Sequence, residues 1–192
     1  SMMVYAGDVD EGERVMAKFR AIATPYADML RPMTYPEMFP PEEGGDYHPI
    51  AANRTMFLDH VDRSVAEFIL TTLQASTANM AVTQLRVLGG AMAQVPVDAT
   101  AFAHRGSKIM ANLAALYDKP EDKDHHENWA SQYESDLRQK DKGAYVNFLG
   151  DVDQKQVRAA YPGDTWKKLG QIKKKYDPTN LFRLNQNIPP KN

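Results

Sequence analysis

The stretch TAFAHRG, residues 100–106, places a histidine beside an arginine in a short polar break between apolar segments. A histidine exchanges its proton near neutral pH, whereas an arginine keeps its positive charge. Because binding residues concentrate on loops, a loop here would present His104 and Arg105 to a ligand. The alternative interpretation is an ordinary surface loop.

The stretch GAYVNFLGD, residues 143–151, predicts a strand over 143–149. Period-two alternation puts Tyr145 and Asn147 on one face of that strand and the intervening apolar residues on the other. A buried phenol and amide need hydrogen-bond partners, which a heteroaromatic ligand with carbonyl groups and ring nitrogens would supply. Tyr145 and Asn147 could equally face water.

The tail RLNQNIPP, residues 183–190, brings together the three side-chain amides of Asn185, Gln186 and Asn187. Amides offer donors and acceptors without charge, which suits a neutral polar ligand or the backbone of another chain. The alternative is a turn with asparagine at its usual places.

Composition excludes several classes of function. The chain has 192 residues, no cysteine and a formal net charge of −2, so it offers no disulfide, no thiolate nucleophile and no basic field for nucleic acid. It lacks the GxSxG, Walker, GxGxxG and HExxH signatures, and the adjacent His125 and His126 are read as surface histidines, so no metal is expected. Without a membrane span or secretory start, a cytoplasmic protein is expected.

These candidate residues must be positioned by short strands and amphipathic helices, which the apolar periodicity predicts. A helix that opens at Asp10 and stops before Pro25 follows the first strand, and a proline-rich loop or lid covers residues 32–49. Strands are predicted over residues 2–6, 53–58, 81–88, 107–116 and 143–149, and further helices over 61–76, 121–139 and 165–176.

Two successive strand–helix–strand blocks predict an α+β fold, in which an antiparallel sheet carries helices packed on one face. The other face of the sheet then needs a cover.

Three strings in this order, GGAMAQVPVDATAFAHRG, YVNFLGD and LGQIKKKYDPTNLFRLNQNIPP, resemble the carboxy-terminal half of berberine bridge enzyme-like FAD-linked oxidases. The resemblance implies a two-domain flavoenzyme in which an antiparallel sheet backed by helices roofs the flavin ring. It implies a substrate-binding domain over residues 1–140. It also implies a carboxy-terminal berberine-bridge segment over 141–192, which packs on an FAD-binding domain that this stretch of sequence does not contain.

The resemblance also implies roles for the candidate residues. Tyr145 would be catalytic, and His104 and Arg105 would bind the substrate. The amides of Asn147, Asn185, Gln186 and Asn187 would contact FAD or its domain. Two differences from the family weigh against assigning its residue roles directly to this chain. The chain has neither a cysteine nor a Gly-rich loop to hold FAD, and Phe148 stands where many members have tyrosine.

The resulting hypothesis is a substrate-binding portion of an FAD-dependent oxidoreductase, inactive alone. The whole enzyme would oxidise an alcohol, sugar or phenolic substrate by hydride transfer to flavin. Its expected partners are that small molecule and an FAD-binding domain in cis or in trans. The alternative is a stand-alone, non-catalytic α+β module that binds a ligand or forms a homodimer through the uncovered sheet face.

Overall fold

The computed structural model describes residues 1–39, 48–150 and 154–191. The chain divides into two compact units, Ser1–Tyr47 and His48–Asn192, each with its own internal contacts. None of the helices in the described ranges combines the length and apolar character needed to cross a bilayer.

The first unit contains helix α1, Val9–Arg20, and the short 3₁₀ helix η1, Tyr35–Met38. Asp8 caps α1 by accepting a hydrogen bond from the Glu11 amide at 3.1 Å. The helix therefore begins before Asp10, the predicted cap, because the earlier aspartate satisfies one of the free amides at the helix start. The predicted strand over residues 2–6 is wrong, since this segment has no strand structure. Residues 40–47 of the predicted loop lie outside the described residues.

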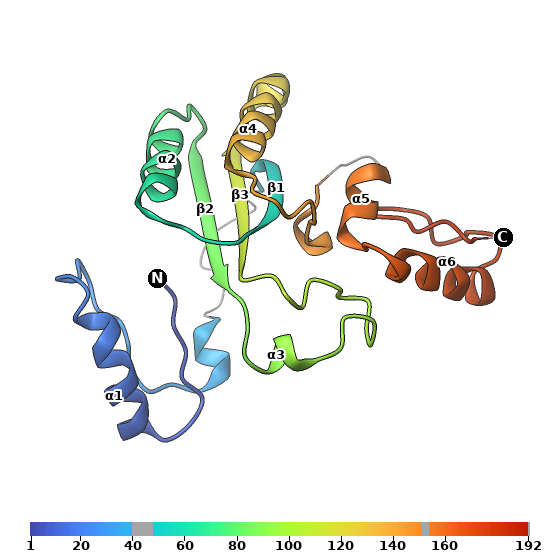
Figure 1. Ribbon diagram of the computed structural model, residues 1–192. Helices are drawn as coiled ribbons and strands as arrows, with labels where there is room; N and C mark the ends of the chain where they lie inside the picture. Colours follow the sequence, from blue (N-terminus) through green and yellow to red (C-terminus); the bar gives the residue numbers. More distant parts are fainter. Residues whose placement is uncertain (40–47, 151–153, 192) are drawn as a thin grey trace. The chain divides into compact units, whose positions relative to one another are not determined.

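The second unit is built on three antiparallel strands in the order β1–β3–β2. Figure 1 shows how helices alternate with these strands along the chain. The elements are β1 Ile50–Leu58, α2 Arg63–Gln74, β2 Met80–Val87, α3 Ala91–Gln94, β3 Ile109–Tyr117, η2 Pro120–Asp122, α4 Lys123–Leu137, η3 Val146–Phe148, α5 Gln154–Ala160 and α6 Asp164–Tyr176.

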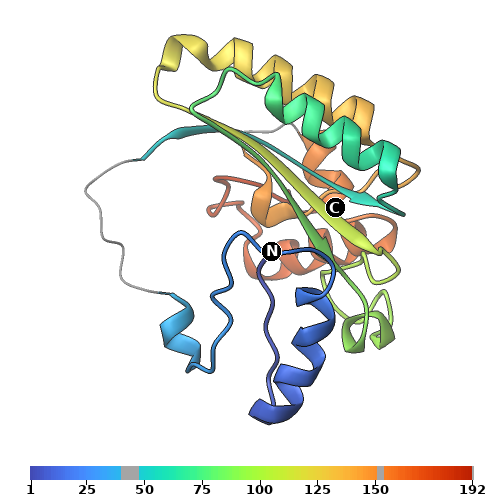
Figure 2. The same cartoon turned by 90° about the vertical axis from the view of Figure 1, so that its left-hand side faces the viewer.

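Helices α2 and α4 cover one face of the sheet, as Figure 2 shows. The core between them is fully buried and is formed by alternate strand residues, including Met56 and Leu113, packed against Tyr133 and Leu137 of α4. Alternation assigns one face of β1 and of β3 to this core, and the amphipathic helices complete it. The predicted α+β class, with an antiparallel sheet and helices on one face, is confirmed.

The predicted strand over residues 143–149 is wrong. The segment runs extended to Tyr145 and then closes the single turn of η3, where the Phe148 amide bonds the Tyr145 carbonyl at 3.1 Å. A short apolar run satisfies its backbone equally well in a turn, so alternation alone cannot distinguish the two. The segment packs against β1 on the face opposite the helices, and thus provides part of the expected cover.

The chain ends in α6 and a tail that folds back along it. The Asp177 carboxylate accepts hydrogen bonds from the amides of Leu181, at 2.7 Å, and Phe182, at 3.1 Å. The Lys191 amide returns to the Gly170 carbonyl of α6 at 3.1 Å. Trp166 and Leu169 of α6 are half-buried, whereas Ile172 is exposed.

Candidate functional site

The sheet face opposite the helices carries a row of polar side chains, one from each strand. Arg54 of β1 pairs with Leu113 and reaches Glu127 of α4 at 2.7 Å, so it lies on the helix side. Thr55, one residue further, therefore lies on the other side. The register pairs Thr55 with Asn112 of β3, and Asn112 with Gln84 of β2. We call Thr55, Asn112 and Gln84 the polar row.

Burial changes along the polar row. Thr55 is 1% exposed and Asn112 7%, whereas Gln84 is exposed. Thr55 Oγ1 and Asn112 Oδ1 are buried side-chain oxygens without a hydrogen-bond partner among the described residues. An unpartnered buried polar atom costs free energy, so each one calls for an explanation such as an ordered water or a ligand. The row thus runs from the solvent at β2 to two unsatisfied oxygens.

An aromatic cluster adjoins the polar row on the same face. His104 stacks on Phe57 of β1 with ring centroids 4.3 Å apart, and Phe102 meets both His104 at 5.7 Å and Tyr145 at 6.1 Å. Arg86 of β2 lies 4.7 Å over the Phe148 ring. The cluster therefore joins the sheet, the 100–106 loop and the segment over 143–149. It also brings together two of the sequence-predicted residues, His104 and Tyr145.

His104 is buried and keeps its neutral form more readily than a free histidine. Its Nε2 lies 3.1 Å from the Ala160 carbonyl of α5, which makes this nitrogen the hydrogen-bond donor. Burial lowers the pKa of His104, and the neighbouring Ala160 carbonyl and Asp141 carboxylate oppose that shift only in part. A neutral, internally bonded ring can orient its neighbours, but its access to a substrate is restricted.

The Arg105 guanidinium makes its hydrogen bonds within its own loop. It donates from Nε to the Phe102 carbonyl at 3.1 Å, and from its terminal nitrogens to the Met92 carbonyl at 3.3 Å and the Thr100 hydroxyl at 2.7 Å. It also lies 5.0 Å over the Phe102 ring. Arg105 therefore fixes the loop on which His104 stands, and substrate binding by Arg105 stays a prediction.

Tyr145 and Asn147 lie on the same side of their segment, as alternation predicted, although the segment is not a strand. The Asn147 amide donates to the Tyr145 hydroxyl oxygen at 3.0 Å. Tyr145 is half-buried against Phe102 and Phe148, and Asn147 is exposed. The hydrogen bond orients the phenol at the open edge of the aromatic cluster.

The tail amides differ from one another in their surroundings. Asn185 adopts a left-handed backbone with φ of 58° and accepts the Asn187 amide at 2.9 Å, which confirms a turn here. Gln186 donates to the Leu149 carbonyl at 2.8 Å and so connects the tail to the Tyr145 segment. Asn187 Oδ1 is buried without a partner among the described residues.

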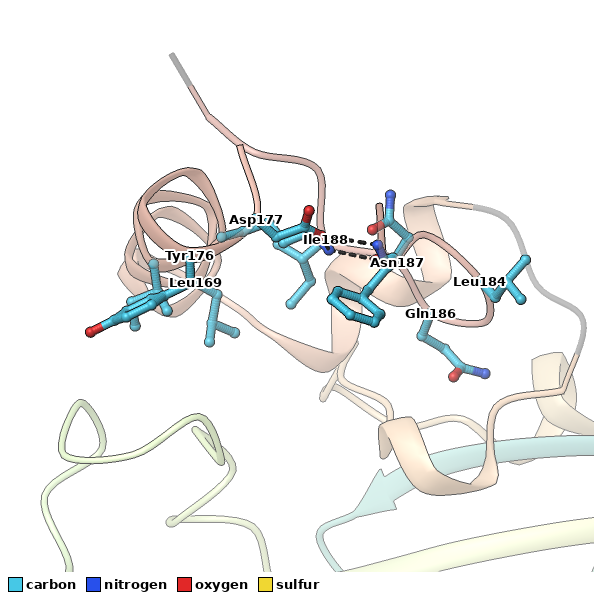
Figure 3. A pocket seen from close by; sticks show the side chains of 10 residues that line it. Leu169, Tyr176, Asp177, Leu184, Gln186, Asn187 and Ile188 are labelled. Carbon is cyan, nitrogen blue, oxygen red and sulfur yellow. Dashed lines mark hydrogen bonds and ion pairs between the residues drawn. The ribbon is translucent and has the colours of Figure 1, made fainter. Parts of the chain in front are cut away.

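Figure 3 shows this turn beside a hollow of about 420 Å³, with Leu169 and Tyr176 of α6 on the other side. Gln186 and Asn187 are part of its lining, and the Lys173–Asp177 ion pair lies at its wall. The unpartnered Asn187 Oδ1 can accept a hydrogen bond from a ring N–H group, such as the one that an isoalloxazine carries. In this respect the tail fits a flavin, although the donors of Gln186 are already used.

Thr55, Asn112 and Gln84 were not among the sequence-predicted site residues. One signal could have found Asn112, because it is a lone amide inside the apolar strand IMANLAALY. No local sequence pattern predicts that Thr55 lies beside Asn112. Within the described ranges, no group of three or more His, Cys, Asp or Glu side chains is arranged to hold a metal ion.

Comparison with known families identifies the carboxy-terminal part of the chain. The family described as "Berberine and berberine like" matches residues 144–189. These residues contain the Tyr145 segment, α5, α6 and the tail turn.

Two relatives extend the match toward the amino terminus. An uncharacterised FAD-linked oxidoreductase of Bacillus subtilis, YgaK, is 30% identical over 135 residues, which cover 68% of this chain and 30% of that protein. An FAD-linked oxidoreductase of Dictyostelium discoideum is 26% identical over 192 residues, which cover 98% of this chain and 42% of that protein. The chain thus spans less than half the length of these relatives.

Solved structures share the fold. Physcomitrella patens BBE-like 1 superposes with a TM-score of 0.64 at 21% identity, covering 75% of this chain and 31% of that one. The berberine bridge enzyme from Eschscholzia californica gives 0.60 at 20% identity, with 73% and 33% covered.

Proposed function

Because this chain belongs to the berberine bridge enzyme-like FAD-linked oxidoreductases and corresponds to their carboxy-terminal portion, we propose that its sheet binds the substrate that the complete enzyme oxidises. The proposed substrate is an alcohol, a sugar or a phenol. FAD, when bound, would supply the hydride acceptor. The residues of this chain would bind and orient the substrate and move its hydroxyl proton.

One observation carries this proposal. The sheet face away from the helices combines a phenol, Tyr145, with the unpartnered oxygens of Thr55 and Asn112. A hydrogen-bonding face beside a half-buried phenol suits a small molecule with hydroxyl groups, since such a site needs few but well-placed polar groups.

Tyr145, as its phenolate, is the proposed proton acceptor for the substrate hydroxyl. Asn147 already donates to its oxygen, and this bond would hold the phenol in one orientation while a substrate approaches. His104 is the proposed positioning residue behind it, because Phe102 contacts both rings. Arg105 would act by holding that loop rather than by neutralising a substrate charge.

FAD would contact the amides of this chain from a part of the protein that these residues do not include. Asn147 and Asn185 are exposed, and Asn187 keeps an unpartnered oxygen. These three could bond polar atoms of the flavin or of its domain, with Gln186 holding the tail turn in place. The FAD-binding part would be joined in cis or associate in trans.

The experiment is a flavin and turnover measurement on the purified 192-residue chain. We expect neither flavin absorbance nor oxidase turnover with alcohols, sugars or phenols, because the chain spans less than half the length of its FAD-linked relatives. Stoichiometric bound flavin would contradict the proposed division of roles.

Sequencing the DNA upstream of Met2 would test the cis arrangement directly, since an in-frame Gly-rich flavin-binding region is expected there.

A second candidate, a stand-alone module that forms a homodimer, is favoured by the exposed apolar side chains. Val87 on the edge strand β2 is 85% exposed, and Phe182 and Leu184 of the tail are 78% and 84% exposed. Exposed apolar groups in this number commonly mark an interaction surface. Either group of exposed side chains could instead contact the FAD-binding part in the first candidate.

A further inference from the structure

We propose that Arg138 is a positioning residue for Tyr145, and that the Glu134 carboxylate holds Arg138 in the orientation that this role requires. This inference rests on the proposed function, in which Tyr145 accepts the proton of the substrate hydroxyl. Arg138 acts on the candidate site through the backbone of residues 141–143. It therefore positions Tyr145 without touching the substrate.

The Arg138 guanidinium organises the turn that leads into the Tyr145 segment. Its Nη1 donates to the carbonyls of Asp141 and Gly143, each at 3.1 Å. The carboxylate of Asp141 in turn accepts the Gly143 amide at 2.6 Å. Both backbone polar groups of Gly143 are therefore bonded, and Tyr145 follows two residues later.

The Tyr145 segment depends on such anchors because it closes a single turn and, among the described residues, belongs to no strand. Its far end is held by Gln186, which donates to the Leu149 carbonyl at 2.8 Å. Between the two ends, the Tyr145 hydroxyl oxygen accepts a hydrogen bond from Asn147 at 3.0 Å. Asn147 moves with the same segment, so this bond cannot by itself fix the phenol relative to the sheet.

Glu134 of α4 is shared by two arginines. One carboxylate oxygen pairs with Arg138, and the other lies 3.5 Å from Nε of Arg54 on β1. These three side chains are between 13% and 23% exposed, so solvent ions screen the pairs less than they screen pairs on the open surface. The carboxylate is thus held from β1 and α4, and it fixes the direction in which Arg138 points.

This network extends from the helix side of the sheet to the side that bears the candidate site. Arg54 lies on the helix side of β1, whereas the Tyr145 segment packs against β1 on the opposite face. Arg138 joins the two, since its Nη2 lies 3.5 Å from the Thr55 carbonyl of β1, an outer strand of the sheet. An arginine suits this place because its planar fork presents several N–H donors at fixed angles, whereas a lysine ammonium is a compact point charge.

The test follows the side-chain amide of Asn147, whose signals report its hydrogen bond to the Tyr145 hydroxyl. These signals would be recorded by NMR on the ¹⁵N-labelled 192-residue chain. Tyr145→Phe removes the acceptor and so gives the reference position for an Asn147 amide without this bond. We expect Arg138→Gln and Glu134→Gln each to move the Asn147 signals more than halfway toward that reference.

Thr83→Val is the control that separates positioning from a general loss of stability. The Thr83 hydroxyl bonds Tyr133 Oη of α4 at 2.7 Å, so this variant weakens the packing of the same helix without touching Arg138. It should melt at a lower temperature than the wild type. Its Asn147 signals should stay at the wild-type position.

Three results would overturn the inference. The first is an unchanged Asn147 signal in folded Arg138→Gln or folded Glu134→Gln, and if only one of these variants folds, that one decides. The second is an equal displacement in Thr83→Val, because the signal would then follow stability alone. The third is an Asn147 signal that Tyr145→Phe leaves in place. Flavin content and turnover test the proposed function separately, so either can fail without the other.

Discussion

Gly143 determines how closely the Tyr145 segment approaches His104. A Cβ built on Gly143 would contact His104 Cε1, and it would lie 2.8 Å from Nδ1 of that ring and 2.9 Å from Asp141 Oδ1. Both neighbours are held in place: His104 stacks on Phe57, and Asp141 accepts the Gly143 amide at 2.6 Å. At the residue scale, the absence of a Cβ atom at Gly143 therefore allows this segment to pack closely against His104.

We predict that Gly143→Ala lowers the free energy of unfolding by about 1–3 kcal/mol, because overpacking displaces the buried ring. Chemical denaturation followed by circular dichroism measures this change. Gly106→Ala is the matched control, since a Cβ there has nothing within 4 Å, and it should leave the midpoint nearly unchanged. Equal stability of the two variants would show that the segment is not packed as described.

At the element scale, His104 joins the 100–106 loop, β1 and α5 in one contact. The ring stacks on Phe57 of β1 and bonds the last residue of α5. Arg138, which follows α4, holds the neighbouring segment by donating to the Asp141 and Gly143 carbonyls, each at 3.1 Å. The Tyr145 segment is therefore positioned from both sides, and its position depends on a histidine that must stay neutral.

This dependence predicts a loss of stability in mild acid. Burial lowers the pKa of folded His104, so the unfolded chain binds more protons once the pH falls below about 6.5, the ordinary histidine value. The contribution of neutral His104 is complete above that pH and is lost as the pH falls toward the folded pKa. The free energy of unfolding of the wild type should therefore fall as the pH is lowered from about 7 to about 5.

The His104→Gln variant gives the comparison for this prediction. This variant should be less stable than the wild type at neutral pH. Its free energy of unfolding should change less with pH between about pH 5 and 7. Carboxylates with lowered pKa values, such as Asp62 and Asp177, titrate below about pH 4 and so fall outside the range used. Parallel curves for both proteins would contradict the role assigned to His104.

At the scale of the whole molecule, exposed apolar side chains gather on α6 and the tail. They are more than half exposed and comprise Ile172, Tyr176, Leu181, Phe182 and Leu184. The Lys173–Asp177 pair and the Lys191 amide hold the tail in this arrangement, so these side chains are held in place by the fold. A fixed apolar surface of this kind favours association with another protein surface.

We therefore predict that the isolated chain self-associates as its concentration rises. Size-exclusion chromatography with light scattering would show a mass above that of the monomer. The double variant Phe182→Ser with Leu184→Ser should return it to a monomer, whereas Val97→Ser, which changes a single exposed valine in the 95–108 connection, should not. A wild-type monomer at every concentration would count against both this surface and the homodimer candidate.

The sequence predicted most of the second unit, and its failures have physical reasons. Apolar segments bounded by turn residues predicted strands over residues 53–58, 81–88 and 107–116, and the structure has them at 50–58, 80–87 and 109–117. The segment over 143–149 was misread, since a turn that bonds its own carbonyls replaces a strand ladder. His126 was expected at the surface, yet it is buried against Tyr117 with ring centroids 4.5 Å apart.

The sequence by itself determined the α+β class, the order of β1, α2, β2, β3 and α4, and the family resemblance, because periodicity and motifs are local properties of the chain. Only the tertiary structure decided that Thr55, Gln84 and Asn112 form one row and that Gln186 meets Leu149. Such neighbours depend on strand register and on the path of the tail. Both are set by packing between segments far apart in the sequence, which no local pattern records.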